Sequence, residues 1–355
     1  MSLDAYVTLG RSGLRVSPFT LGTMTFGEDF GWGSTPEESA RVLSAYVEAG
    51  GNSLDTANLY TNGHSEKIIG DWLAARPGQR DRLVVGTKFF GNLHPGDPNG
   101  GGVGRKGVLH QLEDSLRRLR TDHVDLYWVH NLDPVVPLEE TMRTLDDLVT
   151  AGKVRYVGLS DLPAWRVAQA ATTAQFRDRV PVTALQLEYS LLERTSEAEL
   201  LPAAQALGAG VMPWGPLRNG MLTGKHSRAT GGPTRAMVDP PRESDWAVVD
   251  AVVEVAAEVG ADPAAIALSW LRGRHGVSST IVGARSADQL TRNLTALDLE
   301  LPAGARARLD EVSAPSLPFP AWANARASVL QFGGTTVDGV SHPENPLLSA
   351  SPARY

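Results

Sequence analysis

The feature that most constrains this chain is an alternation of short apolar, β-branched runs with longer stretches of helical period, repeated through most of its 355 residues. Such alternation is typical of a parallel sheet whose strands are joined by covering helices. It predicts eight strands, at residues 21–23, 52–55, 83–88, 125–130, 156–160, 184–188, 210–214 and 280–283. Eight strand–helix units favour a closed (β/α)₈ TIM barrel over an open doubly wound sheet, because eight strands close around an interior that side chains just fill.

Two segments lie outside this repeat. Residues 1–20 contain two short strand patterns around Gly10 and Gly13, which predict a β-hairpin that plugs the bottom of the barrel. Residues 314–355 are rich in Pro, Gly and Ser, carry aromatics at Phe319, Trp322 and Phe332, and predict an irregular tail, either a lid or a loosely ordered terminus. We therefore expect one domain, with the hairpin at 1–20, the barrel at 21–313 and the tail at 314–355, although the length alone suggests two.

The composition excludes several kinds of chemistry. The chain has no cysteine, which rules out disulfides, a thiolate nucleophile and cysteine-ligated metals, and a reducing compartment fits best. The formal net charge of −7 offers no basic field for nucleic acid. No signal-peptide pattern is present and no apolar run approaches ~18 residues, so we expect a cytoplasmic protein without a membrane segment.

Polar residues gather at the ends of the predicted strands, where barrels place their chemistry. Strands end at Asp55, Lys88, His130 and Ser160, and Gln186 lies just before the end of another. Because the carboxyl ends of parallel strands share one rim, these side chains are expected to converge.

Tyr60 follows Asp55 closely and is the candidate acid of this rim. A tyrosine is a poor proton donor at neutral pH because its unperturbed pKa is ~10. A nearby ammonium lowers the pKa of a tyrosine, and Lys88, one of only five lysines in the chain, can supply it while Asp55 holds it in place. His130 can hydrogen-bond a substrate oxygen and orient it toward Tyr60.

Asp55, Tyr60, Lys88 and His130, in this order at these strand ends, resemble the tetrad of the aldo-keto reductases. The resemblance extends from the hairpin to Asn293 and includes the runs Asp55-Thr56-Ala57, Gly152-Lys153-Val154 and Leu222-Thr223-Gly224-Lys225. It implies a metal-free (β/α)₈ barrel that uses NADPH to reduce an aldehyde or ketone to an alcohol. Tyr60 would donate the proton while hydride leaves the nicotinamide.

The resemblance also implies the contacts to NADPH or NADP⁺. At the nicotinamide end they are Thr23, Met24, Asp55, Ser160, Asp161, Gln186 and Trp214, of which Trp214 would stack on the ring and Asp161 replaces a common asparagine. Along the pyrophosphate they are Gly215, Pro216, Leu217, Lys225 and Arg235, and at the adenosine phosphate Gly283, Arg285, Gln289 and Asn293. Arg285 near a helix N-terminus suits a 2′-phosphate, which favours NADPH over NADH.

The substrate is expected to be a small carbonyl compound. The aromatic residues Phe26, Trp32, Phe90 and Trp128 are candidates for an apolar pocket, which favours a substrate of hydrophobic or ring character. The eight histidines show no zinc-like spacing, so no metal site is expected. The run from Gly102 to Gly107 spells a dinucleotide fingerprint but follows no strand, and it predicts instead a glycine-rich loop that ends in a helix start and could border the substrate mouth.

Two other functions stay open. One is a regulatory, redox-sensing module that keeps the barrel and NADPH, as the related potassium-channel β subunits do, although those carry asparagine where this chain has His130. The other is an unrelated barrel enzyme, a metal-assisted hydrolase or an isomerase, whose rim carboxylate binds a metal. The predicted strand ends offer few further ligands for such a metal.

Overall fold

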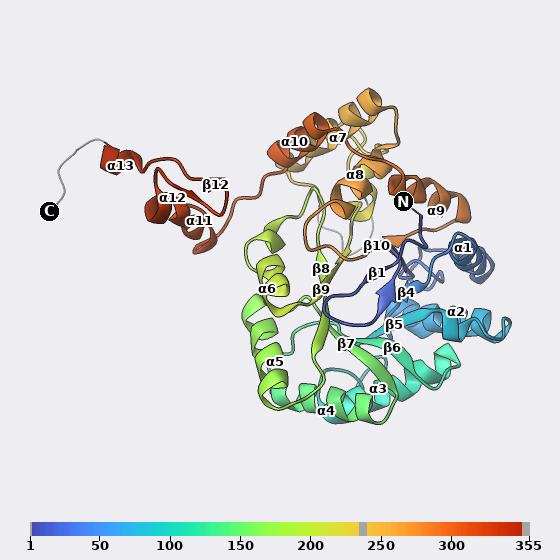
Figure 1. The fold of residues 1–355 in the computed structure, drawn as a ribbon. Helices are drawn as coiled ribbons and strands as arrows, with labels where there is room; N and C mark the ends of the chain where they lie inside the picture. Colours follow the sequence, from blue (N-terminus) through green and yellow to red (C-terminus); the bar gives the residue numbers. More distant parts are fainter. Residues whose placement is uncertain (1, 234–239, 350–355) are drawn as a thin grey trace.

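A computed structural model describes residues 2–233 and 240–349, and eight of its strands form one parallel sheet. These are β3 (Phe19–Gly22), β4 (Ser53–Asp55), β5 (Val84–Phe89), β6 (Val124–Val129), β7 (Val154–Ser160), β8 (Val182–Glu188), β9 (Gly210–Trp214) and β10 (Thr280–Gly283). Each pairs with the next along the chain from β3 to β9, and β10 pairs with β3. The ring closes where Val277, just before β10, bridges to Val211 of β9. The predicted (β/α)₈ barrel is confirmed (Figure 1).

Helices cover the outside of the barrel. Those that follow the successive strands are α1 (Pro36–Glu48), α2 (His64–Ala74), α3 (Arg105–Leu119), α4 (Leu138–Thr150), α5 (Ala164–Phe176), α6 (Leu200–Leu207), α8 (Pro263–Arg272) and α9 (Ala287–Leu294), with α7 (Glu243–Val259) and α10 (Ala303–Val312) added. Short 3₁₀ turns are η1 (Tyr60–Gly63), η2 (Arg80–Arg82), η3 (Thr195–Glu197), η4 (Arg218–Thr223) and η5 (Thr295–Leu297). Among the described residues, no helix combines the length and apolar character that a bilayer crossing requires.

The first of these helices shows how local sequence sets a helix boundary. The Thr35 side chain accepts a hydrogen bond from the Glu38 backbone N–H at 3.2 Å, and Pro36 occupies the first turn, where its missing N–H costs nothing. The apolar face of α1 then buries Tyr46, whose hydroxyl donates to the Phe19 carbonyl of β3 at 2.7 Å. Thr35 and Pro36 thus set where α1 begins, and Tyr46 attaches the helix to β3, the strand that precedes it.

The N-terminal hairpin closes one end of the barrel, as predicted. Strands β1 (Val7–Thr8) and β2 (Arg15–Val16) pair antiparallel. From this hairpin Leu9, Leu14 and Val16 pack against inward-facing residues of the barrel strands, among them Trp128 and Met212, in one buried cluster. The cluster fills the barrel interior below the carboxyl ends of the strands with packed apolar side chains.

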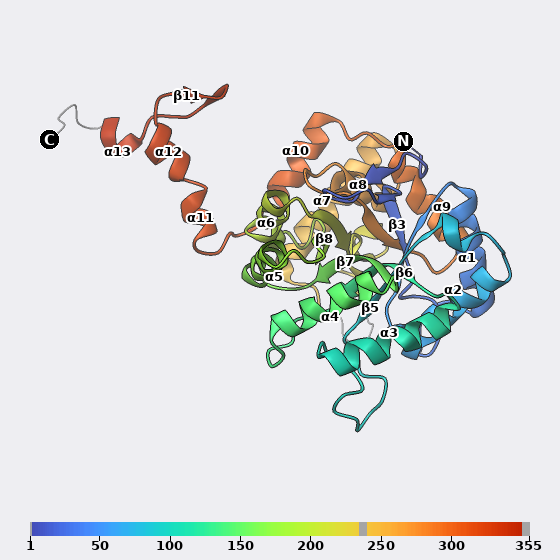
Figure 2. The same cartoon turned by 60° about the horizontal axis from the view of Figure 1, so that its bottom comes forward.

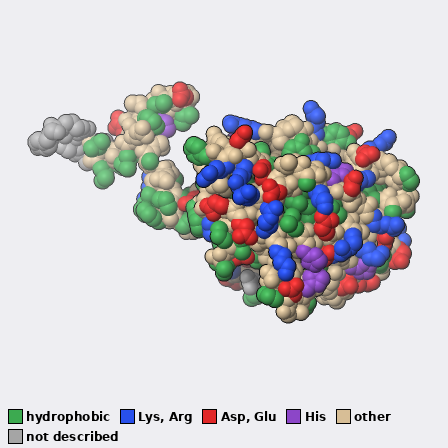
Figure 3. All heavy atoms as spheres, turned by 90° about the horizontal axis from the view of Figure 1, so that it is seen from below, with side chains coloured by type: hydrophobic (Ala, Val, Ile, Leu, Met, Phe, Trp, Pro, Cys, Tyr) green, Lys and Arg blue, Asp and Glu red, His purple; other side chains and the backbone are tan. Residues whose placement is uncertain are grey.

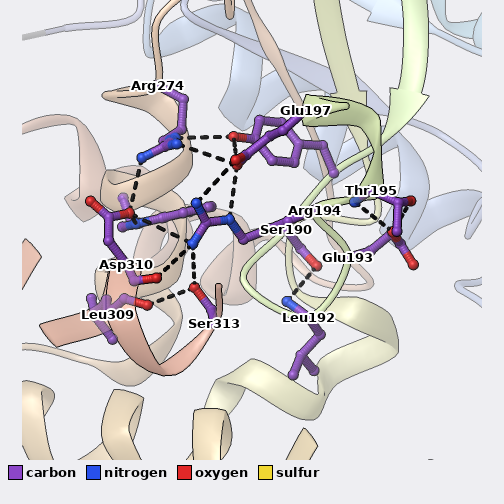
Figure 4. A network of polar contacts seen from close by, with 12 residues as sticks. Ser190, Leu192, Glu193, Arg194, Thr195, Glu197, Arg274, Leu309, Asp310 and Ser313 are labelled. Carbon is purple, nitrogen blue, oxygen red and sulfur yellow. Dashed lines mark hydrogen bonds and ion pairs between the residues drawn. The ribbon is translucent and has the colours of Figure 1, made fainter. Parts of the chain in front are cut away.

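A polar network fastens α10 to the barrel. Figure 4 shows Arg194, from the segment after β8, between Glu197, Asp310 and Ser313. Arg274 bridges the same elements, donating to Asp310 Oδ1 at 2.9 Å and lying 3.3 Å from Glu197 Oε1. Because each of these buried or half-buried charges has a partner of opposite charge, the desolvation cost is offset and α10 is held at a defined place.

The C-terminal tail leaves the barrel after α10. It contains α11 (Ala321–Asn324), α12 (Ala327–Phe332), the hairpin of β11 (Thr336–Val337) and β12 (Val340–Ser341), and α13 (Pro346–Ser349). Figures 1 and 2 both show it extending away from the side of the barrel. In neither view does the tail cover the barrel.

Gly10 tests how tightly the hairpin is seated. Its φ is +57°, and a Cβ there would lie 2.5 Å from Gly210 N and 2.7 Å from Gly208 O, both backbone atoms that cannot move aside. We expect Gly10→Ala to lower the free energy of unfolding by about 2–4 kcal/mol, from left-handed backbone strain plus overpacking. Urea denaturation measures this.

Gly13→Ala is the matched control in the same turn, because a Cβ at Gly13 meets nothing within 4 Å. We expect its unfolding free energy to stay within about 0.5 kcal/mol of wild type. Equal effects of the two substitutions would contradict the docking of the hairpin described above.

Candidate active site

Four of the residues predicted from the sequence lie together at the carboxyl ends of neighbouring strands. Asp55 is the last residue of β4, Lys88 lies near the end of β5, and His130 directly follows β6. Tyr60 begins η1, on the segment that follows β4. The barrel topology places all four on one rim because its parallel strands end on the same side.

The Lys88 ammonium lies at the centre of this group. Its side chain is completely buried, and Nζ donates to Asp55 Oδ2 at 2.5 Å, to the Thr56 carbonyl at 2.9 Å and to Tyr60 Oη at 3.0 Å. Three acceptors match the three protons of an ammonium. The other oxygen of Asp55 accepts from Gln186 Nε2 at 2.9 Å. The buried charge is thus both paired and hydrogen-bonded, the condition under which such a pair is tolerated.

The proton of Tyr60 is held more firmly than the sequence suggested. Burial raises the pKa of Tyr60 by more than the Lys88 ammonium lowers it, so its pKa lies above the ordinary value rather than below it. Burial also lowers the pKa of Lys88, but Asp55 and Tyr60 outweigh that effect and raise it on balance. At neutral pH the site therefore contains a protonated tyrosine beside an ammonium.

His130 is a neutral imidazole in this site. Burial, together with the nearby Lys88 charge, lowers its pKa to about 3. Its ring lies edge-on to the ring of Tyr60, with centroids 6.0 Å apart and planes at 79°. The Nδ1 atom is buried and has no hydrogen-bond partner within the described part of the chain. A neutral imidazole can hydrogen-bond a ligand oxygen without adding charge.

The two residues after Tyr60 have strained backbone conformations, and hydrogen bonds from Thr61 stabilise them. Thr61 and Asn62 adopt left-handed conformations, with φ of 46° and 57°. The Thr61 hydroxyl donates to the Phe26 carbonyl at 2.7 Å and accepts from the Ser65 backbone N–H at 3.1 Å. Non-glycine residues in this region persist only where surrounding contacts hold them, which is frequent at functional sites. These contacts fix the direction in which Tyr60 leaves the backbone.

Two further groups, not expected from the sequence, support the site. Glu66 is fully buried; its carboxylate accepts from Thr87, the neighbour of Lys88, at 2.5 Å and from Arg118 Nε at 2.6 Å. Asn58 Nδ2 donates to Gln111 Oε1 at 2.9 Å, which joins the Tyr60 segment to α3. No local pattern could reveal these pairs, because the partners are far apart in sequence. The sequence offered only a glutamate in the first turn of a helix, without its partners.

The residues expected at the nicotinamide end line the same rim. Thr23 and Ser160 are buried, and Thr23 Oγ1 donates to the Asp55 carbonyl at 3.0 Å, whereas Met24 is 47% exposed. Asp161 has a φ of +56°, and its carboxylate accepts from Trp214 Nε1 at 3.0 Å and from Ser160 at 3.2 Å. Burial raises the pKa of Asp161. The carboxylate thus fixes the half-buried indole of Trp214, which the fold brings to the end of β9.

The residues expected along the phosphates lie after β9 and β10. Gly215, with φ of +67°, leads through Pro216 and Leu217 into η4, and a Cβ on Gly220 would come within 2.8 Å of Lys225 Nζ. Gly283 ends β10; the exposed Arg285 follows, and its backbone N–H donates to Gln289 Oε1 at 2.9 Å. Asn293 is buried, and its Nδ2 has no hydrogen-bond partner among the residues that the structure describes. Arg235 lies outside the described residues.

This donor set fits a phosphorylated dinucleotide. Lys225 and Arg285 are cations at exposed positions, α9 begins next to Arg285, and Asn293 offers an orphaned amide donor. Anions bind well at helix N-termini and beside guanidinium groups.

Two of the four predicted pocket aromatics are not pocket walls. Phe26 and Trp128 are fully buried: Phe26 belongs to the main core, and Trp128 fills the barrel interior against the hairpin. Their spacing in the sequence could not show that both point into packed protein. Trp32 and Phe90 are half-buried. The exposed Phe30, which was not among the predicted pocket residues, packs near Trp32, with 5.8 Å between the two ring centroids. Trp32 and Phe90 remain the candidates.

Comparison with known proteins agrees, over most of the chain, with the family resemblance found in the sequence. The sequence profile of the Aldo/keto reductase family matches residues 18–314. Norsolorinic acid reductase of Emericella nidulans is 38% identical over 298 residues, 82% of this chain and 76% of that protein. An NADP(+) aryl-alcohol dehydrogenase of Phanerodontia chrysosporium is 34% identical over 311 residues, covering 81% and 80%. A putative voltage-gated potassium channel subunit beta of Schizosaccharomyces pombe is 33% identical over 302 residues, covering 82% and 87%.

The lowered pKa of His130 predicts a specific pH dependence of stability. The unfolded histidine binds a proton near pH ~6.5, whereas the folded one does so only near about 3, so the unfolded state binds more protons between these values. Lowering the pH from about 7 to about 5 should therefore destabilise the wild type by about 1–2 kcal/mol more than His130→Gln. Urea denaturation at both pH values tests this, and equal losses in the two proteins would show that His130 is protonated when folded.

Proposed function

This chain belongs to the aldo/keto reductase family, and we propose that it is an NADPH-dependent oxidoreductase that reduces the carbonyl group of an aldehyde or ketone to an alcohol. The observation that carries the proposal is the 3.0 Å contact between Lys88 Nζ and Tyr60 Oη, backed by the buried Asp55 carboxylate. It supplies a protonated tyrosine whose conjugate base would be stabilised at once by a fixed positive charge.

The chemistry follows from the positions of the side chains. When bound, the nicotinamide supplies the hydride that reduces the carbonyl carbon. Tyr60 gives its proton to the carbonyl oxygen as negative charge develops there, and the Lys88 ammonium stabilises the phenolate that remains until it regains a proton from solvent. His130, being neutral, hydrogen-bonds the oxygen and directs it toward Tyr60 without competing as an acid.

The residues proposed for the cofactor divide by chemistry. Trp214, fixed by Asp161, offers a flat aromatic face for the nicotinamide ring. Lys225 would neutralise the pyrophosphate, and Arg285 beside the first turn of α9 would bind the 2′-phosphate that distinguishes NADPH from NADH.

The relative named as a potassium channel subunit supports a second candidate, a cofactor-binding module that regulates a partner. The intact tetrad favours the enzyme, because a module of that kind has no need for an acid held against an ammonium. The two candidates differ in whether removing the Tyr60 hydroxyl abolishes turnover.

Tyr60→Phe should lower kcat for a reactive aromatic aldehyde by about 10²–10⁴-fold, because it removes the proton donor and leaves the ring in place. The measurement is NADPH oxidation at saturating aldehyde. NADPH affinity, followed by fluorescence, is the control and should change by less than about threefold. Turnover close to that of the wild type, with the cofactor still bound, would refute the role of Tyr60.

Arg285→Ala should weaken NADPH binding by about 10–100-fold and leave NADH binding almost unchanged, because a charge-assisted phosphate contact is worth about 1.5–3 kcal/mol. Arg292→Ala is the matched control, since Arg292 is an exposed arginine at the other end of α9. A preference for NADPH that survives Arg285→Ala would remove Arg285 from the 2′-phosphate site.

A further inference from the structure

A cluster of possible metal ligands lies outside the active site, on the outer side of the barrel. His110 and Asp114 lie one turn apart on α3, and His94 belongs to the loop that joins β5 to α3. Asp114 Oδ2 lies 3.5 Å from His94 Nε2 and 3.7 Å from His110 Nε2, and the three ligand atoms all lie within 4.8 Å of one another. Figure 3 views the molecule from the side of α3 and α4, where histidine side chains gather at the surface.

We propose that His94, His110 and Asp114 bind one transition-metal ion of the Zn²⁺ class, and that the bound ion fastens the β5–α3 loop to α3. The ligand separations carry the proposal. In a tetrahedral zinc site with bonds of ~2.0–2.1 Å, ligand atoms lie about 3.3–3.5 Å apart. Two of the separations are already close to that value, so a small rotation of the exposed histidines completes the site.

The donor set selects the kind of ion. Two imidazole nitrogens and one carboxylate oxygen suit Zn²⁺ and its neighbours, whereas Mg²⁺ and Ca²⁺ prefer oxygen ligands alone. Because three protein ligands leave one tetrahedral position, a water molecule would complete the coordination.

The carboxylate is already aimed at the proposed ion. The side chain of Asp114 is only 9% exposed, while those of His94 and His110 are 47% and 52% exposed. Arg117 binds the other carboxylate oxygen, Oδ1, and so leaves Oδ2 facing the two histidines. The positive charge of Arg117 opposes a cation, but its side chain is 71% exposed, so water screens that repulsion. Partners that orient a ligand in this way commonly raise metal affinity.

The proposed metal site would also restrain the β5–α3 loop, to which His94 belongs. The loop projects at the lower edge of Figure 2 and starts at Phe90, directly after the strand that carries Lys88. Gln111 holds its base, accepting from the Phe90 backbone N–H and donating to the Gly102 carbonyl, each at 2.9 Å. Its outer part reaches α3 through His94, whose Nε2 lies 3.5 Å from Asp114 Oδ2. A metal at His94 would thus tie down the part of the loop that Gln111 does not hold.

The experiment is a calorimetric titration of the untagged 355-residue chain with ZnCl₂. We expect one Zn²⁺ per chain in the wild type and at least tenfold weaker binding in His94→Ala and in His110→Ala. His123→Ala is the matched control, because His123 also faces an aspartate, with Nδ1 2.7 Å from Asp122 Oδ1. Its affinity should equal that of the wild type. Zn²⁺ binding that is absent, or that is unchanged in the double variant His94→Ala/His110→Ala, overturns the proposal.

A second measurement tests the effect on the loop. Zn²⁺ should slow backbone hydrogen exchange in residues 91–104 of the wild type at least threefold, and should not do so in His94→Ala. If Zn²⁺ binds with the expected dependence on His110 but leaves exchange in the loop unchanged, the fastening of the loop is wrong. Neither readout uses turnover, so the result is independent of the proposed reductase activity.

Discussion

The buried contact between Lys88 and Asp55 is the interaction on which the rest of the site depends. A fully buried ammonium costs several kcal/mol unless its protons and charge are matched. Two neighbouring strands supply this pairing. Asp55 of β4 lies opposite Gly86 of β5, and Lys88 lies two residues farther along β5 on the same face. The Lys88 ammonium can therefore donate to the Asp55 carboxylate. The strand register therefore positions the Lys88 ammonium, and it places that ammonium 3.0 Å from Tyr60 Oη.

The chemistry of the rim also depends on burial. Apolar side chains, among them Leu9 of the hairpin and the inward Trp128, fill the barrel interior, and Lys88 is itself completely buried. In that environment charged forms are penalised, which keeps Tyr60 protonated and His130 neutral. Burial at the rim, rather than charge alone, therefore decides which protonation state each of these residues keeps.

Much of the fold and of the site could be predicted because the signals are local and repeated. Each strand is a short apolar run, so all eight strands were found, and the tetrad followed from polar residues at the ends of those runs. Predictions that required knowledge of packing were less successful. The pKa of Tyr60 moves upward because burial outweighs Lys88, and Phe26 and Trp128 point into the core rather than into a pocket. The His94, His110 and Asp114 cluster has no sequence spacing typical of zinc, since one ligand comes from a loop and two from a helix.

The sequence by itself determined the order of strands and helices, the hairpin, and the identities of the rim residues, because hydrophobic period and strand-end position are properties of short segments. Only the tertiary structure decided which of those residues are in contact and how deeply each is buried. Contact and burial in turn decide whether each residue is protonated at neutral pH. The tertiary structure also decided the supports that no local pattern predicts, such as Glu66 beneath Thr87 and Asn58 against Gln111. The physical reason is that burial and electrostatic coupling depend on neighbours distant in the chain, and the closing of the barrel is what brings those neighbours together.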